Sequence, residues 1–195
     1  MPRTLALILN LALGFGFACS LVSADAPAVA DTDSDAAKTT EITFFGESKL
    51  TVPADFEPAE KGSRMLDYEF AATTGDGDDA QKARVTMMAS GGGVQPNIKR
   101  WQGQFVGGDP KAKKTEVMEV GQWKIHVVDN NGSFADRMGG GPFGGGKVVK
   151  KEDWAMTGAI LEHPEGRLYF VKMIGPGEVV KENREALIKM LKSVQ

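Results

Sequence analysis

The residue types that most often perform covalent or acid–base chemistry are sparse in this sequence. It contains two histidines and one cysteine. His126 and His163 fall on different predicted hairpins, and neither has a second histidine at the short spacing that places two imidazoles on one metal ion. Cys19 lies in a segment that we expect to be cleaved off, which leaves no thiol nucleophile. The sequence shows no catalytic constellation, and we predict that the protein is not an enzyme and carries no cofactor.

A glycine-rich tract at residues 138–147 has the spacing of a phosphate-binding loop. Residues 141–147 match G-x-x-x-x-G-K, in which backbone N–H groups cradle nucleotide phosphates. The match is incomplete, because Val148 supplies no hydroxyl for magnesium and the residues after it favour a strand or loop over the required helix. We therefore predict an exposed loop and no nucleotide site. Phe143 at its tip and Lys147 at its end are candidate binding residues.

Three aspartates, Asp31, Asp33 and Asp35, have the spacing that opens a calcium-binding loop. The sixth position of such a loop requires glycine and is Ala36, and the twelfth requires a bidentate glutamate and is Ile42. These carboxylates are therefore expected to be solvated, and we predict no metal site.

The composition is that of an ordinary globular protein of 195 residues, with 42% hydrophobic and 25% charged residues. This length fits a single domain with a sizeable core. The formal net charge is -3. Proteins that bind nucleic acid usually present a basic surface to the phosphates, so the charge argues against nucleic acid as a partner. A protein partner is left open.

Residues 1–24 have the features of a signal peptide. Arg3 supplies a positive start, residues 5–18 form an apolar stretch, and residues 22–24 (VSA) provide the small side chains that a signal peptidase requires. Residues 25–40 are small and polar without periodicity, which predicts a disordered linker. We expect an exported protein, periplasmic or extracellular.

Cys19 offers an alternative to simple cleavage, since a lipidated cysteine would become the first residue of a membrane-anchored lipoprotein. Ala18 and Ser20 on either side suit this reading, whereas Gly16 stands where bacterial lipoprotein signals usually have leucine. Membrane attachment is expected only if Cys19 is lipidated.

Residues 85–105 predict the central unit of the fold: a strand, a turn of three glycines and a short helix. The glycines end the strand because glycine adopts positive φ without strain. An apolar stripe at helical spacing follows, formed by Val94, Ile98, Trp101 and Phe105. Lys99 and Arg100 lie outside this stripe, so we expect the stripe to pack on a sheet and take Lys99 and Arg100 as candidate binding residues.

Two later hairpins extend the predicted sheet. The first joins residues 116–120 to 123–128, and the second joins residues 153–163 to 167–174. Both faces of the second hairpin are largely apolar, which indicates a sheet covered on both sides. A closing helix begins at Gly175-Pro176 and carries an apolar stripe through Leu187 and Leu191. We predict a single domain over residues 41–195.

The order of these elements resembles the PsbP-like group. The resemblance lies in a strand that enters VPADFEP, the segment NIKRWQGQF after a glycine turn, two hairpins, and a helix that ends in LIKMLKSV; it covers residues 41–195. It implies an α+β fold in which helices flank both faces of a central antiparallel β-sheet, an α/β/α sandwich. Members include extrinsic subunits of photosystem II and, on the same fold, nuclear-transport proteins that bind the Ran GTPase. No ligand residue of the group matches a position here, and the glycine tract departs from its pattern.

The function that follows from these observations is that of an exported, non-enzymatic binding or assembly module. Two alternatives remain open: a metal-dependent or hydrolytic envelope enzyme, and a structural envelope protein or lipoprotein. We expect the residues around Lys99, Arg100 and Phe143 to form the contact surface.

Overall fold

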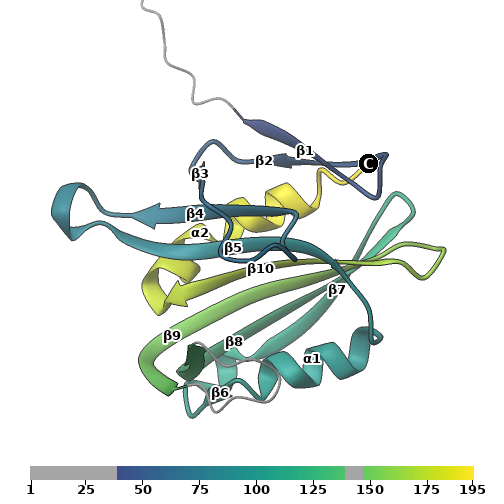
Figure 1. Cartoon of the computed structure of the whole chain (residues 1–195). Helices are drawn as coiled ribbons and strands as arrows, with labels where there is room; N and C mark the ends of the chain where they lie inside the picture. The colour runs from purple at the N-terminus through teal and green to yellow at the C-terminus, as the bar shows by residue number, and fades with distance from the viewer. Residues whose placement is uncertain (1–38, 139–146) are drawn as a thin grey trace, which may run out of the picture. The chain divides into compact units, whose positions relative to one another are not determined.

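Most of the chain forms β-strands, which join into one large antiparallel sheet (Figure 1). The computed structural model describes residues 39–138 and 147–195. The large sheet has eight strands. One of them, β7 (Lys114–Val120), pairs with β8, and β6 also pairs with β8. The other seven, in spatial order, are β3 (Phe56–Pro58), β4 (Tyr68–Thr74), β5 (Gln81–Ser90), β10 (Leu168–Pro176), β9 (Lys147–Glu162), β8 (Trp123–Met138) and β6 (Phe105–Val106).

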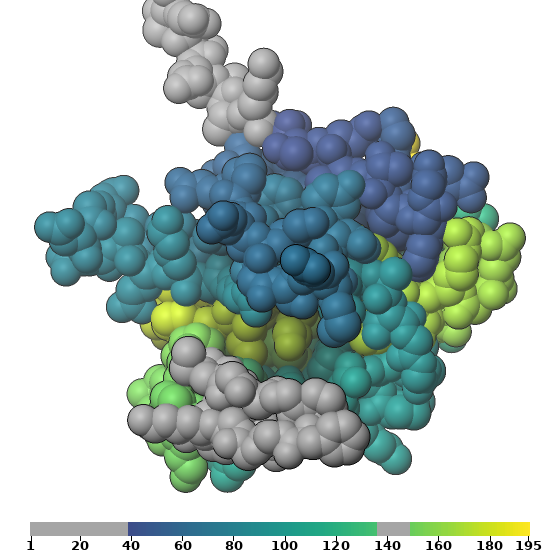
Figure 2. Space-filling view, viewed as in Figure 1, coloured from purple at the N-terminus to yellow at the C-terminus, as the bar shows by residue number. Residues whose placement is uncertain are grey.

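A small second sheet and two helices pack on the large sheet. The small sheet consists of β1 (Thr40–Phe44) and β2 (Ser48–Val52), shown in purple and blue in Figure 2. Helix α1 (Val94–Gln102) follows β5, and helix α2 (Gly177–Leu191) follows β10. Short 3-10 turns span Gly77–Asp79 and Pro110–Ala112.

One face of the large sheet is covered by α2 and the small sheet. Successive side chains of a strand point to opposite faces, so alternate residues share a face. On this face Val85 and Met87 of β5 and Val171 and Met173 of β10 form one buried core with Leu187 of α2. Burial of such side chains stabilises the fold by about 1.5–3 kcal/mol each, which makes this face the main source of stability.

A buried ion pair holds α2 on this face. Arg184 donates from Nε and Nη2 to the carboxylate of Asp129 on β8, at 2.8 to 3.1 Å. Thr157 of β9 donates from Oγ1 to the same carboxylate at 2.8 Å. These hydrogen bonds from Arg184 to Asp129, opposed by partial desolvation, raise the pKa of Arg184 above its ordinary value. Because a buried charge is costly unless it is paired, the contact fixes how α2 sits on β8 and β9.

The small sheet is joined to the chain just after α2. The backbone N–H of Thr51 in β2 donates to Oγ of Ser193 at 2.8 Å, across 142 residues of sequence. Lys49 and Gln195 also exchange two backbone hydrogen bonds, each of 3.1 Å. The strands that come first in the described chain are therefore held by residues that come last.

Helix α1 packs on the opposite face of the large sheet. The side chains of Ile98 and Trp101 are 4% and 3% exposed, so the apolar stripe is buried as predicted. The indole of Trp101 lies against Gly158 of β9, where a Cβ atom would come within 2.7 Å of the ring. Asn130 of β8 donates from Nδ2 to the backbone oxygens of Trp101 and Gln102, at 3.3 and 3.1 Å. The end of α1 is thereby fixed to β8 and β9.

The predicted fold class is wrong. The structure is mostly β, with a large eight-stranded antiparallel sheet, and is not an α/β/α sandwich with helices flanking both faces. The physical reason is size: α1 has nine residues and spans about 14 Å, whereas β8 and β9 have 16 residues each and extend about 50 Å. Among residues 39–138 and 147–195, one short helix covers only part of the second face, although the strands of this face carry apolar residues.

Individual elements agree better with the sequence prediction. Both predicted helices and both hairpins are present, but α1 ends at Gln102, and Phe105 belongs to β6. β8 and β9 continue well beyond their predicted ends, up to Met138 and from Lys147. The predicted signal peptide and Phe143 lie outside the described residues. Within the predicted linker, residues 25–38 lie outside as well, whereas Thr40 already belongs to β1.

The contact between Gly158 and Trp101 predicts that alanine at position 158 destabilises the protein, whereas intrinsic strand propensity alone predicts the opposite. Replacing Gly158 by alanine places a methyl group 2.7 Å from a buried ring. We expect the overpacking to lower the free energy of unfolding by about 1–3 kcal/mol, measured by urea denaturation. Alanine normally favours a strand over glycine, so a stabilised Gly158→Ala variant would contradict this packing.

Gly91 provides the matched control for Gly158→Ala. A Cβ on Gly91 meets nothing within 4 Å, and Gly91 is not among the glycines with positive φ. We expect Gly91→Ala to change the free energy of unfolding by less than about 1 kcal/mol.

Candidate functional site

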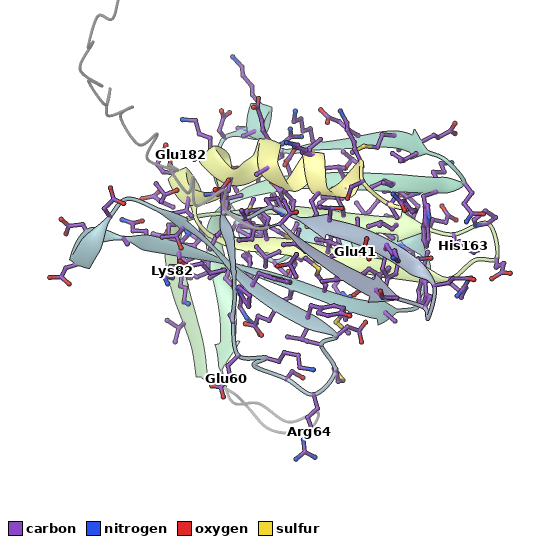
Figure 3. The ribbon with its side chains drawn as sticks, turned by 90° about the horizontal axis from the view of Figure 1, so that it is seen from above. Glu41, Glu60, Arg64, Lys82, His163 and Glu182 are labelled. Atoms are coloured by element: carbon purple, nitrogen blue, oxygen red, sulfur yellow. The ribbon has the colours of Figure 1, made fainter. Side chains whose placement is uncertain are left out.

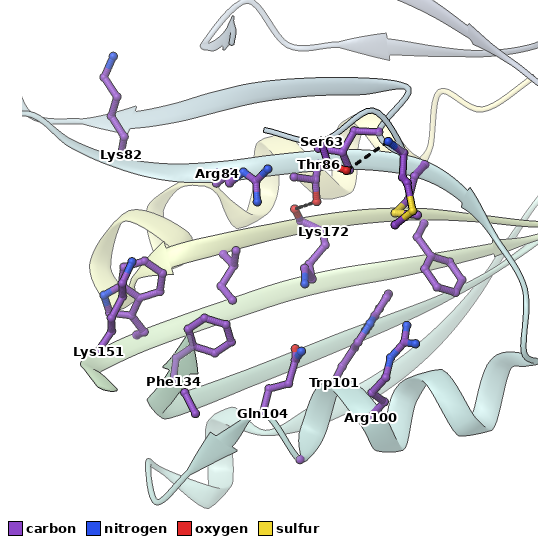
Figure 4. Close-up of a pocket in the computed structure, with 18 residues that line it drawn as sticks. Ser63, Lys82, Arg84, Thr86, Arg100, Trp101, Gln104, Phe134, Lys151 and Lys172 are labelled. Carbon is purple, nitrogen blue, oxygen red and sulfur yellow. Dashed lines mark hydrogen bonds between the residues drawn. The ribbon is translucent and has the colours of Figure 1, made fainter. Parts of the chain in front are cut away.

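In the described part of the chain, the region of the second face that α1 does not cover forms a groove beside α1. Its cavity volume is about 760 Å³, within the range of about 300–1,000 Å³ that is usual for small-molecule sites. Figure 4 shows α1 along one side, with Arg100 and Trp101 reaching toward the sheet. Ser63, Met65 and Leu66, which precede β4, line the other side.

The floor of the groove comes from β5 and β10, which are neighbours at the middle of the sheet. The pairing of these strands sets three cross-strand pairs in a row: Arg84 with Ile174, Thr86 with Lys172, and Met88 with Phe170. Two residues along a strand are about 6.8 Å apart, so the row is about 13 Å long. The floor therefore changes along its length, from Arg84 and Lys172 at one end and the centre to Met88 and Phe170 at the other.

Aromatic rings build much of the walls. Trp101 and Phe170 contact edge to face, with ring centroids 5.2 Å apart. At the end of the groove away from Trp101, the rings of Phe134 and Trp154 are stacked, with centroids 5.8 Å apart and an angle of 5° between their planes. Nζ of Lys151 lies 4.1 Å from the centroid of the Trp154 ring, in a cation–π contact. These contacts hold the rings in place before any ligand enters.

The charge of the lining is all of one sign. Five basic residues line the groove: Lys82, Arg84, Arg100, Lys151 and Lys172. None of the eighteen described lining residues is an aspartate or a glutamate. A low-dielectric wall beside charges of one sign raises the local concentration of oppositely charged ligands. The groove is thus suited to an anion.

Two of these cations pair with carboxylates outside the lining. Arg84 donates from Nε to Oε1 of Glu69 and from Nη2 to Oε2, the latter at 3.0 Å. The backbone N–H of Gly62 donates to the same Oε2 at 2.7 Å. Lys82 pairs with Glu57 at 3.3 Å on the exposed surface. The bidentate pair holds the guanidinium of Arg84 in a fixed position at the edge of the floor.

A polar side chain just after the C-terminal end of α1 also faces the groove. Gln104 follows α1 and its side chain points toward the floor in Figure 4. Its Oε1 atom is buried and makes no hydrogen bond to any described residue. A buried carbonyl oxygen without a donor is costly, so a ligand group that donates a hydrogen bond to this Oε1 atom would gain affinity here.

The described lining of the groove combines positive charge with apolar surface. Its polar groups are cations, hydroxyls and one carboxamide, and it includes neither a carboxylate nor a histidine among its described residues. Within residues 39–138 and 147–195, no group of three or more histidine, cysteine, aspartate or glutamate side chains could hold a metal ion. The lining chemistry favours an organic anion with an apolar body.

Of the four residues predicted to bind, the structure describes the side chains of two, Lys99 and Arg100. Arg100 lines the groove, whereas its neighbour Lys99 is exposed on α1 and is not part of the lining. Lys147 begins β9, opposite Met138, and its side chain lies outside the described part of the structure, as does the whole of Phe143. One of the four is therefore placed in the groove.

The cations of the floor, Lys172 and Arg84, are not among the residues predicted to bind. Lys172 is the only charged residue in an otherwise apolar strand, and Lys82, Arg84 and Thr86 alternate with apolar neighbours. Either pattern could have shown that one face of β5 and β10 is cationic. The prediction instead treated both faces as covered, so these side chains were not considered as ligands.

The two histidines lie outside the groove. His126 is buried and its Nε2 lies 3.0 Å from Oε2 of Glu162. His163 lies at the turn between β9 and β10, with its ring 4.8 Å from that of Trp123. Figure 3 shows His163 at the opposite end of the sheet from Lys82. Both imidazoles have structural partners and neither lines the groove.

Comparison of the chain with protein-family models and with curated proteins finds no match. The kinship to the PsbP-like group stays a prediction, and a function must be argued from the residues of the groove. Among the helices of the described residues, none is both long enough and apolar enough to cross a membrane.

The Arg84–Glu69 pair at the groove edge predicts how stability depends on pH. The hydrogen bonds from Arg84, aided by the N–H of Gly62 and opposed by burial, hold the pKa of Glu69 below its ordinary value of 4.5. A pKa that is lower in the folded state stabilises the fold above the unfolded pKa, and this contribution is lost as the pH falls through the folded pKa. We expect Glu69→Gln to lose about 1–3 kcal/mol of unfolding free energy at pH 7.

The pH profile separates this effect from a general loss of packing. The difference between wild type and Glu69→Gln, measured by urea denaturation, should shrink from about pH 5 to about pH 3. Arg84→Gln removes the same hydrogen bonds from the other side and should give a similar convergence. If both variants keep a constant difference from wild type across this range, the proposed effect of the pair on Glu69 is wrong.

Proposed function

We propose that this protein is an exported, non-enzymatic binding module whose binding surface is the groove between α1 and the floor strands β5 and β10. Its ligand is an organic anion that carries an apolar part. The observation that carries the proposal is the lining itself, whose eighteen described residues join five cations to aromatic and aliphatic side chains and include no carboxylate. The signal-peptide features of residues 1–24 support export.

The lining explains why tight binding requires both the anionic group and the apolar part of the ligand. The cations alone would bind any small anion weakly, because exposed charges contribute about 0–1 kcal/mol each and are screened by salt. The apolar side chains add roughly 25 cal/mol for each Å² of apolar surface removed from water. A ligand that meets both therefore gains affinity that neither half provides alone.

The groove is also largely formed in advance. The Trp101–Phe170 and Phe134–Trp154 contacts and the Arg84–Glu69 pair are present in the structure described. A site whose side chains are already ordered spends less conformational entropy on binding. This supports a binding role for the groove, because no large rearrangement of its described lining is required.

Titration with 1-anilinonaphthalene-8-sulfonate, a fluorescent aromatic sulfonate, tests the proposal on the full-length chain. We expect saturable binding of one dye per chain that weakens as salt is raised. Arg100→Gln should weaken it by about fivefold, the equivalent of about 1 kcal/mol for one exposed charge-assisted contact. Absence of saturable binding would refute the proposed function.

Lys99→Gln is the matched control, since it removes the same charge from the adjacent position of α1 but lies outside the groove lining. We expect it to bind the dye as the wild type does. Equal losses in Lys99→Gln and Arg100→Gln would show that the dye responds to the net charge of α1, and the groove would then not be the site.

A further inference from the structure

The floor of the groove changes in polarity along one direction, which restricts the shape of the ligand. Along the floor the cross-strand pairs run from Arg84 with Ile174, through Thr86 with Lys172, to Met88 with Phe170. The two cations of the floor thus lie at one end and the centre, and the opposite end is apolar. A ligand that matches this floor has its anionic group at one end and an extended apolar part at the other.

The apolar end is built for a flexible chain. Leu66 and Met88 line it together with Met65, whose side chain is 72% exposed at the rim. Methionine side chains are unbranched and adapt to irregular apolar ligands. An exposed large hydrophobic side chain at the rim of a groove gains most when a ligand covers it.

The aromatic residues do not favour a planar base or a string of bases. Binding of single-stranded nucleic acid relies on open ring faces on which successive bases stack. Here the Trp101 indole is 3% exposed and packs on Gly158 and Phe170. The Trp154 indole is already in contact with Phe134 and Lys151. The rings act as walls, and an aliphatic chain can lie along such walls without displacing these contacts.

We infer that the ligand of the groove is a single-chain lipid, an acyl chain with one anionic head group. The head group lies over Lys172 and Arg84, and the acyl chain extends over Met88 and Phe170 toward Met65. This inference rests on the proposed function, because it names the ligand class of the same groove.

Calorimetric titration of the full-length chain with octanoate, decanoate and dodecanoate, each below its micelle-forming concentration, tests the inference. Each added methylene that becomes buried should tighten binding by up to about fourfold. 1-Dodecanol, which has the chain without the charge, should bind at least tenfold more weakly than dodecanoate. Affinity that is independent of chain length, or equal for the alcohol and the acid, would overturn the inference.

Met65→Ser and Val106→Ser form a matched pair of variants. Both residues are exposed apolar side chains, at 72% and 69%, but Val106 is not part of the groove lining. Because both are exposed, neither change should prevent folding. We expect Met65→Ser to weaken dodecanoate binding by about fivefold with little effect on octanoate, and Val106→Ser to change neither. If the two variants change dodecanoate binding equally, the acyl chain does not lie at Met65.

Two further titrations test rival ligand classes, a small inorganic anion and a single-stranded nucleic acid. Inorganic phosphate at millimolar concentration should not displace dodecanoate, and an eight-residue oligothymidylate should not bind more tightly than dodecanoate. Displacement by phosphate or preference for the oligonucleotide would overturn the lipid assignment. If the fatty acids do not bind while the dye still does and remains sensitive to Arg100→Gln, the inference fails and the proposed function stands.

Discussion

The position of α1 depends on one close contact, the indole of Trp101 against the backbone of Gly158. A side chain at position 158 would occupy the space of the ring, because a Cβ atom there would be 2.7 Å from it. Glycine lets the indole reach the sheet, and Asn130 then holds the last turn of α1 through its backbone oxygens. Since α1 forms one wall of the groove and carries Arg100, the width of the groove follows from this contact.

The two faces of the large sheet handle charge in different ways. On the face covered by α2, the buried charge of Asp129 is matched by Arg184 and Thr157, and the contact is closed. On the other face the basic side chains lie beside apolar ones and remain partly in water. The first face buries its paired charge inside the core, whereas the basic side chains of the second face, including Arg84 with its partner Glu69, line a groove. The same sheet thus supplies both a core and a binding surface.

The sequence was sufficient for most of the local elements and insufficient for their arrangement. The spacing of Val94, Ile98 and Trp101 identifies a buried helical stripe, and the turns at Gly121 and Gly166 locate the hairpins. What the pattern does not contain is how much sheet a helix covers. Apolar residues on both faces of a strand require cover, but a short helix, an aromatic wall and a partly open groove satisfy that requirement as well as a full layer does.

The candidate site shows the same division between local and long-range information. Arg100 could be singled out because it leaves the apolar stripe of its own helix, a property of neighbouring residues. Lys172 and Arg84 become part of a site only through the pairing of β10 with β5, whose partners are separated by more than eighty residues of sequence. Without that register, a lysine in an apolar strand and an alternating basic strand remain separate observations.

The hydrogen bond between Thr51 and Ser193 has a consequence for the order of folding. The small sheet and α2 share one core, yet 142 residues separate the partners of this bond. Closing so long a loop is slow, because its entropy is lost before the contacts that reward it are made. During synthesis the strands of the small sheet, the first in the described part of the chain, cannot complete their packing until the segment after α2 has been made. The small sheet is therefore the part of the described structure that is completed last.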